Sequence, residues 1–79
     1  MRDYRIQIQR TGHWMLVDLE DFLRAKDILW YKTQGVGGSQ DYTIHTRSGV
    51  SFEDYVGIAG QRLANKPLHD MRRVNYAPS

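Results

Sequence analysis

The chain contains no cysteine among its 79 residues. This absence excludes a disulfide framework, a zinc site with thiolate ligands and a cysteine nucleophile. The apolar core alone must therefore hold the fold together, and a chain of this length buries about 60% of the surface that its unfolded form exposes. A composition without cysteine also favours a reducing compartment.

Long apolar runs are missing as well. No stretch approaches the roughly 18 apolar residues that mark a transmembrane helix. The first residues, Met1 to Tyr4, lack the apolar segment of a secretory signal peptide. We therefore expect a soluble, cytoplasmic protein that forms a single domain over residues 1–79.

The charges nearly balance, because eleven basic residues face nine acidic residues and give a formal net charge of +2. This excess is small for a protein dedicated to nucleic-acid binding. Eight of the basic residues are arginines, however. Arginine makes bidentate and stacking contacts, so its predominance over lysine suits an interaction surface. A compositional bias of the source genome would also explain the excess of arginine over lysine. An interaction surface and a compositional bias are both open interpretations at this point.

Two strands are predicted at the start of the chain. Apolar and polar residues alternate strictly from Tyr4 to Gln9, which is typical of a half-buried strand. The segment from Thr11 to His13 has the composition of a turn, and Trp14 to Val17 follows as a second strand. We expect these strands to pair as an antiparallel hairpin.

A short helix is predicted next. Asp18 stands at the capping position of a helix expected from Leu19 to Lys26, with Asp21 in its first turn. Residues 28–33 are rich in β-branched and aromatic side chains and predict a third strand. Helical spacing extends to Trp30, so a helix that continues through Trp30 is the alternative.

A fourth strand and the main helix follow. Residues 42–47 alternate in polarity and predict a strand that pairs with the third. Ser51 begins a capping-box pattern, so a helix is expected from Phe52 to about Asn65. Gly57 and Gly60 fall inside it, and each costs about 1 kcal/mol relative to alanine. We expect a close backbone approach to compensate, either to the sheet or to a second copy of the chain.

Together these elements predict a small α+β fold. We expect an antiparallel sheet of about four strands, with the helix of residues 52–65 packed on one face and a short helix near residues 19–26. After Pro67, the chain is expected to add a strand within residues 71–76 or to trail over the surface. The predicted core consists of Tyr4, Ile6, Ile8, Leu16, Phe22, Leu29, Tyr31, Ile44, Phe52, Val56, Ala59 and Leu63.

The sequence shows no catalytic or metal-binding pattern. His13, His45 and His69 are far apart and lack the spacing of a metal-ligand pair. No serine lies in a nucleophile elbow. We therefore expect no metal, no cofactor and no catalytic residue.

The glycine-rich loop of residues 35–40 raises a phosphate-binding hypothesis, because backbone amides in such loops can bind anions. Its glycines match neither the Gly-x-x-x-x-Gly-Lys-Ser/Thr pattern nor the Gly-x-Gly-x-x-Gly pattern of known phosphate-binding loops. The loop also leads into a strand instead of a helix. We predict a hairpin loop whose tip, at Gly37 and Gly38, contacts a partner.

Aromatic and cationic residues interleave along the third and fourth strands, as they do on sheets that bind single-stranded nucleic acid. Because alternation sends neighbours to opposite faces, no more than half of them can form one platform. A pair of arginines follows near the end of the chain. The predicted binding residues are Trp30, Gly37, Gly38, Tyr42, Arg47, Arg72 and Arg73.

These features favour a non-enzymatic binding protein that occupies a surface on a larger protein or ribonucleoprotein complex. By size and class alone, phage and mobile-element inhibitors of host systems, including anti-CRISPR proteins, are comparable. A nucleic-acid-binding regulatory module that uses the same arginines is the first alternative. A small enzyme with carboxylates assembled from Asp41, Glu53 or Asp54 is the second. A homodimer is a further alternative, and no membrane partner is expected.

Overall fold

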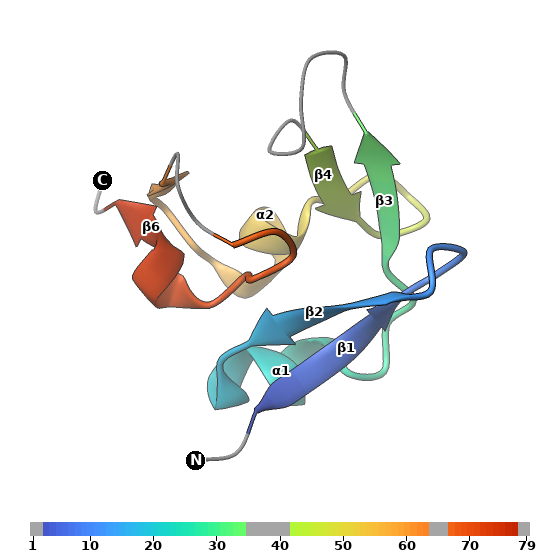
Figure 1. Ribbon diagram of the computed structural model, residues 1–79, viewed down its shortest axis with the longest axis horizontal. Helices are drawn as coiled ribbons and strands as arrows, with labels where there is room; N and C mark the ends of the chain where they lie inside the picture. Colours follow the sequence, from blue (N-terminus) through green and yellow to red (C-terminus); the bar gives the residue numbers. More distant parts are fainter. Residues whose placement is uncertain (1–2, 35–41, 64–66, 78–79) are drawn as a thin grey trace.

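The computed structural model describes residues 3–34, 42–63 and 67–77, and these form three antiparallel strand pairs and short helices (Figure 1). The elements are β1 (Tyr4–Ile8), β2 (His13–Val17), α1 (Leu19–Ala25), β3 (Tyr31–Gln34), β4 (Tyr42–His45), α2 (Phe52–Val56), β5 (Gln61–Arg62), the 3-10 helix η1 (Arg73–Asn75) and β6 (Tyr76–Ala77). The α+β class is confirmed. The single sheet of four strands is wrong, since β1–β2, β3–β4 and β5–β6 form separate two-stranded sheets in the described part of the chain.

The hairpin of β1 and β2 is confirmed. Ile6 and Ile8 are buried, as their alternation with polar residues predicts. On β2 the buried side chains are those of Met15 and Val17, whereas the predicted core residue Leu16 is half-buried. The pairing register explains this difference, because Met15 lies opposite Ile6 and therefore shares its face.

Strand β3 begins later than predicted, and its inward face is the other one. A parallel bridge between Ile8 and Trp30 joins its start to the end of β1, and the indole of Trp30 points inward and donates to the Ala25 carbonyl at 3.0 Å. The helix alternative through Trp30 is wrong, since α1 ends at Ala25. Leu29 is exposed and Tyr31 half-buried, so neither belongs to the core as predicted.

Helix α1 starts where the sequence predicts, but its cap differs. Asp18 occupies the N-cap position, and its carbonyl oxygen accepts hydrogen bonds from the amides of Asp21 and Phe22, but its side chain accepts none from the helix. Its Oδ2 instead accepts a 2.8 Å hydrogen bond from the backbone amide of Arg73. The residue expected to begin α1 therefore also binds the C-terminal segment.

Helix α2 is much shorter than predicted. Ser51 caps it as expected, because its Oγ accepts a 3.2 Å hydrogen bond from the amide of Asp54. The extension to Asn65 is wrong, since Gly57 adopts a φ of 80° and ends the helix after Val56. Glycine reaches this left-handed conformation without the cost that a Cβ imposes, so Gly57 is a helix terminator and not an interior residue.

Gly60 makes the close backbone approach that the sequence predicts. A Cβ on Gly60 would overlap the carbonyl oxygen of Ala77. The predicted close backbone approach is therefore found at Gly60, toward β6 of the same chain. Because this segment is not helical, Ala59 and Leu63 are exposed and do not join the core as predicted.

The C-terminal segment folds back across the molecule. In Figure 1, residues 67–77 run beside α2 and end in β6, which pairs with β5. The Leu16 backbone accepts from the Met71 amide at 2.8 Å and donates to the His69 carbonyl at 2.9 Å. Met71 is fully buried. The segment therefore contributes Met71 and Tyr76 to the core and is not a surface tail, and only Tyr76 of the strand predicted over residues 71–76 lies in a strand.

In the described part of the chain, the core gathers side chains from all three strand pairs and both α-helices. Trp30 lies at its centre, with the Phe52 ring 5.3 Å away in an edge-to-face arrangement. The buried hydrophobic residues are Ile6, Ile8, Met15, Val17, Ala25, Trp30, Tyr42, Ile44, Phe52, Val56, Met71 and Tyr76. Within the described ranges, no helix has the length and apolarity needed to cross a membrane.

Candidate functional site

Two of the aromatic residues predicted to bind a partner lie in the core. Trp30 is 0% exposed and Tyr42 is 4% exposed. The Tyr42 hydroxyl accepts a 3.1 Å hydrogen bond from the His69 amide and lies 3.7 Å from the Met71 sulfur. Both rings therefore stabilise the fold, and neither presents a surface to a partner.

The paired arginines of the C-terminal segment bind carboxylates of the chain itself. Arg72 donates from Nε and Nη2 to the two carboxylate oxygens of Asp70, at 2.8 and 2.6 Å. Arg73 donates in the same bidentate way to Asp21, at 3.1 and 2.9 Å. Such pairs are strong and geometrically specific. The structure therefore places both guanidinium groups in ion pairs within the chain, although the side chains of Arg72 and Arg73 remain 41% and 36% exposed.

These ion pairs shift the pKa values of Asp70, Arg72 and Arg73. Burial alone would raise the pKa of Asp70, but the hydrogen bonds and charge of Arg72 outweigh it and hold that pKa below its usual value. The hydrogen bond to Asp70 raises the pKa of Arg72, and the hydrogen bond to Asp21 raises the pKa of Arg73. The C-terminal segment is thus held by charges that favour the ionised forms.

A third arginine is also internally bound. Arg62 donates from Nε to the Glu53 carboxylate at 3.1 Å and lies over the Tyr42 ring, 4.5 Å from its centre. Glu53 also accepts a 2.8 Å hydrogen bond from the Tyr76 hydroxyl. One of the carboxylates considered for catalysis is therefore part of a structural cluster. Asp41, the second, lies outside the described residues, and Asp54 is exposed on α2.

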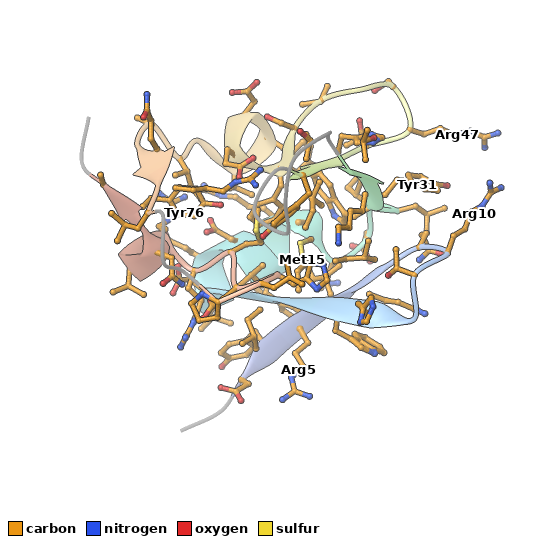
Figure 2. The ribbon with its side chains drawn as sticks, turned by 45° about the horizontal axis from the view of Figure 1, so that its top comes forward. Arg5, Arg10, Met15, Tyr31, Arg47 and Tyr76 are labelled. Atoms are coloured by element: carbon orange, nitrogen blue, oxygen red, sulfur yellow. The ribbon has the colours of Figure 1, made fainter. Side chains whose placement is uncertain are left out.

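Two arginines differ from these three. Within the described ranges, the guanidinium groups of Arg10 and Arg47 form no ion pair or hydrogen bond, and both side chains are exposed. Figure 2 shows them pointing to the same side of the molecule, with Tyr31 between them, whereas Arg5 points away on another side. The predicted binding residue Arg47 is thus accessible. Arg10, which lies in the turn between β1 and β2, borders the same hollow.

These side chains border a solvent-open hollow of about 530 Å³, which we call the cationic cleft. It lies where the tip of the β1–β2 hairpin meets β3 and the end of β4. None of its described lining residues is acidic or aliphatic. They are Gln9, Arg10, Thr11, Tyr31, Lys32, Thr33, His45 and Arg47.

Backbone hydrogen bonds position Arg10 beside β3. The Gln9 amide donates to the Trp30 carbonyl at 2.7 Å, which fastens the hairpin tip to the start of β3. The Thr11 hydroxyl donates to the Ile8 carbonyl at 2.9 Å and closes the turn. Arg10 itself has a φ of 65°, a conformation that costs a residue with a Cβ about 1 to 2 kcal/mol. Strained residues are common at functional sites.

The floor of the cationic cleft is an ordered pair of rings. Tyr31 lies opposite His45 across the β3–β4 hairpin, and their rings stack at 6.4 Å and 29°. His45 Nδ1 lies 2.8 Å from the Thr46 carbonyl, which can only accept, so Nδ1 carries the hydrogen. In the neutral ring, Nε2 then accepts from the Thr33 hydroxyl at 2.6 Å. Both ring nitrogens are engaged, and this fixes the orientation of the stack.

Lys32 lines the cationic cleft but directs its charge elsewhere. Its Nζ lies 3.0 Å from His69 Nε2 and 5.1 Å from the centre of the Tyr42 ring. Arg10 and Arg47 therefore supply the accessible positive charge of the cationic cleft.

The remaining predictions concern loops and metals. Gly37 and Gly38 lie outside the described residues. The rings of His13 and His69 lie 5.2 Å apart, which the sequence spacing did not suggest. Among residues 3–34, 42–63 and 67–77, however, no three metal-ligating side chains gather into a group that could hold a metal ion.

Sequence reasoning missed Arg10 and Tyr31 as site residues. Arg10 falls at the boundary between a predicted strand and a predicted turn, and no local signal reveals its conformation. The sequence predicts Tyr31 in the core, but Trp30 and not Tyr31 lies on the inward face. The interleaved cations and aromatics of residues 30–47 were the available signal. Of these, Trp30 and Tyr42 are buried, Tyr31, Lys32 and His45 are half-buried, and Arg47 is exposed.

Comparison with known proteins gives no match. No protein-family model matches the sequence, and neither the curated proteins nor the solved structures show a significant similarity to it. The geometry of the cationic cleft therefore carries the functional argument.

Proposed function

We propose that the protein is a non-enzymatic binding protein and that an anionic group of a larger macromolecular partner occupies the cationic cleft. One observation carries this proposal. Arg62, Arg72 and Arg73 each bind a carboxylate of the chain, whereas Arg10 and Arg47 converge on one cleft without any such partner among the described residues.

The chemistry of the cleft supports an anionic occupant. A guanidinium is permanently charged and presents a planar set of donors that fits carboxylate or phosphate oxygens. No carboxylate of the described lining competes for these donors. The Tyr31–His45 stack, which hydrogen bonds to both His45 ring nitrogens hold in place, also reduces the ordering that binding requires.

The lining supports binding more than catalysis. The cleft is lined by one imidazole, that of His45, and both of its ring nitrogens are engaged by neighbouring groups. A catalytic base needs a free site within reach of its proton. The absence of enzymatic activity stays a prediction.

The mode of action would be occupancy of a surface. A protein of this size can block or redirect a larger complex by covering one contact site. Inhibition of a host system, a phage origin and a cytoplasmic location stay predictions that rest on size and class. Homodimer formation also stays a prediction, and the two glycines that suggested it have internal roles at the end of α2 and beside β6.

Chromatography on heparin, a sulfated polyanion, tests the proposal. We expect the variant Arg10→Ala/Arg47→Ala to elute at markedly lower salt than the wild-type protein, because it loses the accessible guanidinium groups. The control Arg5→Ala/Lys26→Ala removes the same charge from exposed ion pairs outside the cleft. It should elute close to the wild type. Equal shifts for both double variants would contradict the proposal, since net charge alone would then explain retention.

A further inference from the structure

We infer that the occupant of the cationic cleft is single-stranded nucleic acid, with one base stacked on Tyr31 and the flanking phosphates bound by Arg10 and Arg47. This inference rests on the proposed function and names the class of partner. Figure 2 shows the juxtaposition that suggests it, an aromatic ring with a guanidinium group on each side.

The Tyr31 ring provides the stacking surface. Tyr31 is half-buried and stacks against His45, so its position is fixed before a ligand arrives. It belongs to the outer face of β3–β4, because its neighbour Lys32 lies opposite the buried Ile44 on the inner face. Bases of every sequence can stack on such a ring, and single strands are commonly bound in this way.

Arg10 and Arg47 supply the contacts to phosphate. A nucleotide strand carries a phosphate on either side of each base, and the cleft that contains the Tyr31 ring is also lined by the two cations Arg10 and Arg47. Arginine contacts phosphate oxygens bidentately and also stacks on bases. The amide side chain of Gln9, which can both donate and accept, adds a group suited to a base edge or a sugar.

An acidic peptide fits this surface less well. Peptide anchors bury apolar or aromatic side chains in pockets that are largely aliphatic or aromatic. The described lining of the cationic cleft contains no aliphatic residue that could form such a pocket. A duplex fits less well too, since its bases are stacked on one another and cannot reach Tyr31.

Fluorescence anisotropy with labelled oligonucleotides tests the inference. The probes are fluorescein-labelled oligothymidylate and oligouridylate of about 15 nucleotides, which compare DNA with RNA. We expect wild-type protein to bind at least one of them at low salt. Tyr31→Leu should weaken binding about 5- to 150-fold, which corresponds to the loss of one stacked base, whereas Tyr31→Phe should retain it. Arg10→Ala/Arg47→Ala should weaken binding about tenfold or more and reduce its salt dependence.

The competitors separate failure of this inference from failure of the proposed function. Unlabelled poly-L-glutamate and duplex DNA should displace the probe poorly. If poly-L-glutamate bound through Arg10 and Arg47 while the oligonucleotides did not bind, the nucleic-acid inference would be overturned and the proposed function would stand. Oligonucleotide binding that Tyr31→Leu leaves unchanged would also overturn the inference. If no polyanion responded to the loss of Arg10 and Arg47, both would fall.

Discussion

Arg73 and Asp21, which are 52 residues apart in the sequence, form a bidentate ion pair in which the Asp21 carboxylate is fully buried. The same arginine donates to the carbonyl oxygen of Val56 at the end of α2, at 2.8 Å. Its guanidinium therefore joins both helices to the C-terminal segment. The arginine pair that looked like a binding element in the sequence is one of the contacts that close the fold.

Arg73→Ala should lower the free energy of unfolding by about 2 to 4 kcal/mol. The substitution leaves the Asp21 charge buried without a counter-ion, and Arg73 is 36% exposed, so the loss should be smaller than for a completely buried pair. Urea unfolding followed by circular dichroism measures it. Arg5→Ala, which breaks an exposed pair, serves as the control and should stay within about 0.5 kcal/mol of the wild type. A loss for Arg73→Ala as small as that of the control would contradict the structural role.

Gly60→Ala should destabilise the protein more than Gly57→Ala. An added Cβ at Gly60 meets the backbone of Ala77, so β5 and β6 must separate, at a cost of about 1 to 3 kcal/mol or more. At Gly57 the Cβ meets nothing within 4 Å, and the cost is the left-handed conformation, about 1 to 2 kcal/mol. Urea unfolding of both variants compares the two mechanisms. Our description of β5–β6 would be refuted if Gly60→Ala were as stable as the wild type.

Tyr76 should make stability fall at alkaline pH. Burial raises the pKa of Tyr76, and the Glu53 carboxylate beside it raises it further. Because the folded pKa lies above the unfolded value of about 10, this contribution is complete below about pH 10 and is lost as the pH rises further. Tyr76→Phe should therefore cost about 1 to 2 kcal/mol at neutral pH, the value of its hydrogen bond, and the difference from wild type should shrink above about pH 10. Unfolding curves at several alkaline pH values measure this difference, and a difference independent of pH would speak against the buried hydroxyl.

Arg10→Gly should separate stability from binding. Glycine adopts the left-handed conformation of residue 10 freely, which offsets its larger loss of entropy on folding. We expect the variant to be as stable as the wild type or more stable by up to about 1 kcal/mol, while its retention on heparin falls. Thermal melts and heparin elution test both parts. A variant that lost more than about 1 kcal/mol would show that the guanidinium itself stabilises the turn.

Local patterns predicted the elements whose signals lie within a few residues. The alternation of Tyr4 to Gln9 gave the first hairpin, and Ser51 gave the start of α2. Gly57 carries a local signal of the opposite kind, because glycine commonly ends helices. Recognising that signal would have shortened α2 and left Leu63 outside the core.

Long-range contacts decided what local patterns could not. The inward face of β3 depends on the bridge between Ile8 and Trp30, and the burial of Met71 depends on pairing with the backbone of Leu16. Neither contact has a local sequence signal. The same limit applies to the site, since the sequence counts arginines but does not show that Arg73 is paired and Arg10 is not.

The most direct test of the central claim is a map of backbone amide chemical shifts in an NMR titration with oligothymidylate. We predict that the shifts change mainly at the residues lining the cationic cleft, with Arg10, Tyr31 and Arg47 among the largest changes. Residues near Arg5 and on the β5–β6 pair should change little. Changes centred on those distant residues, with the cationic cleft unaffected, would contradict the account.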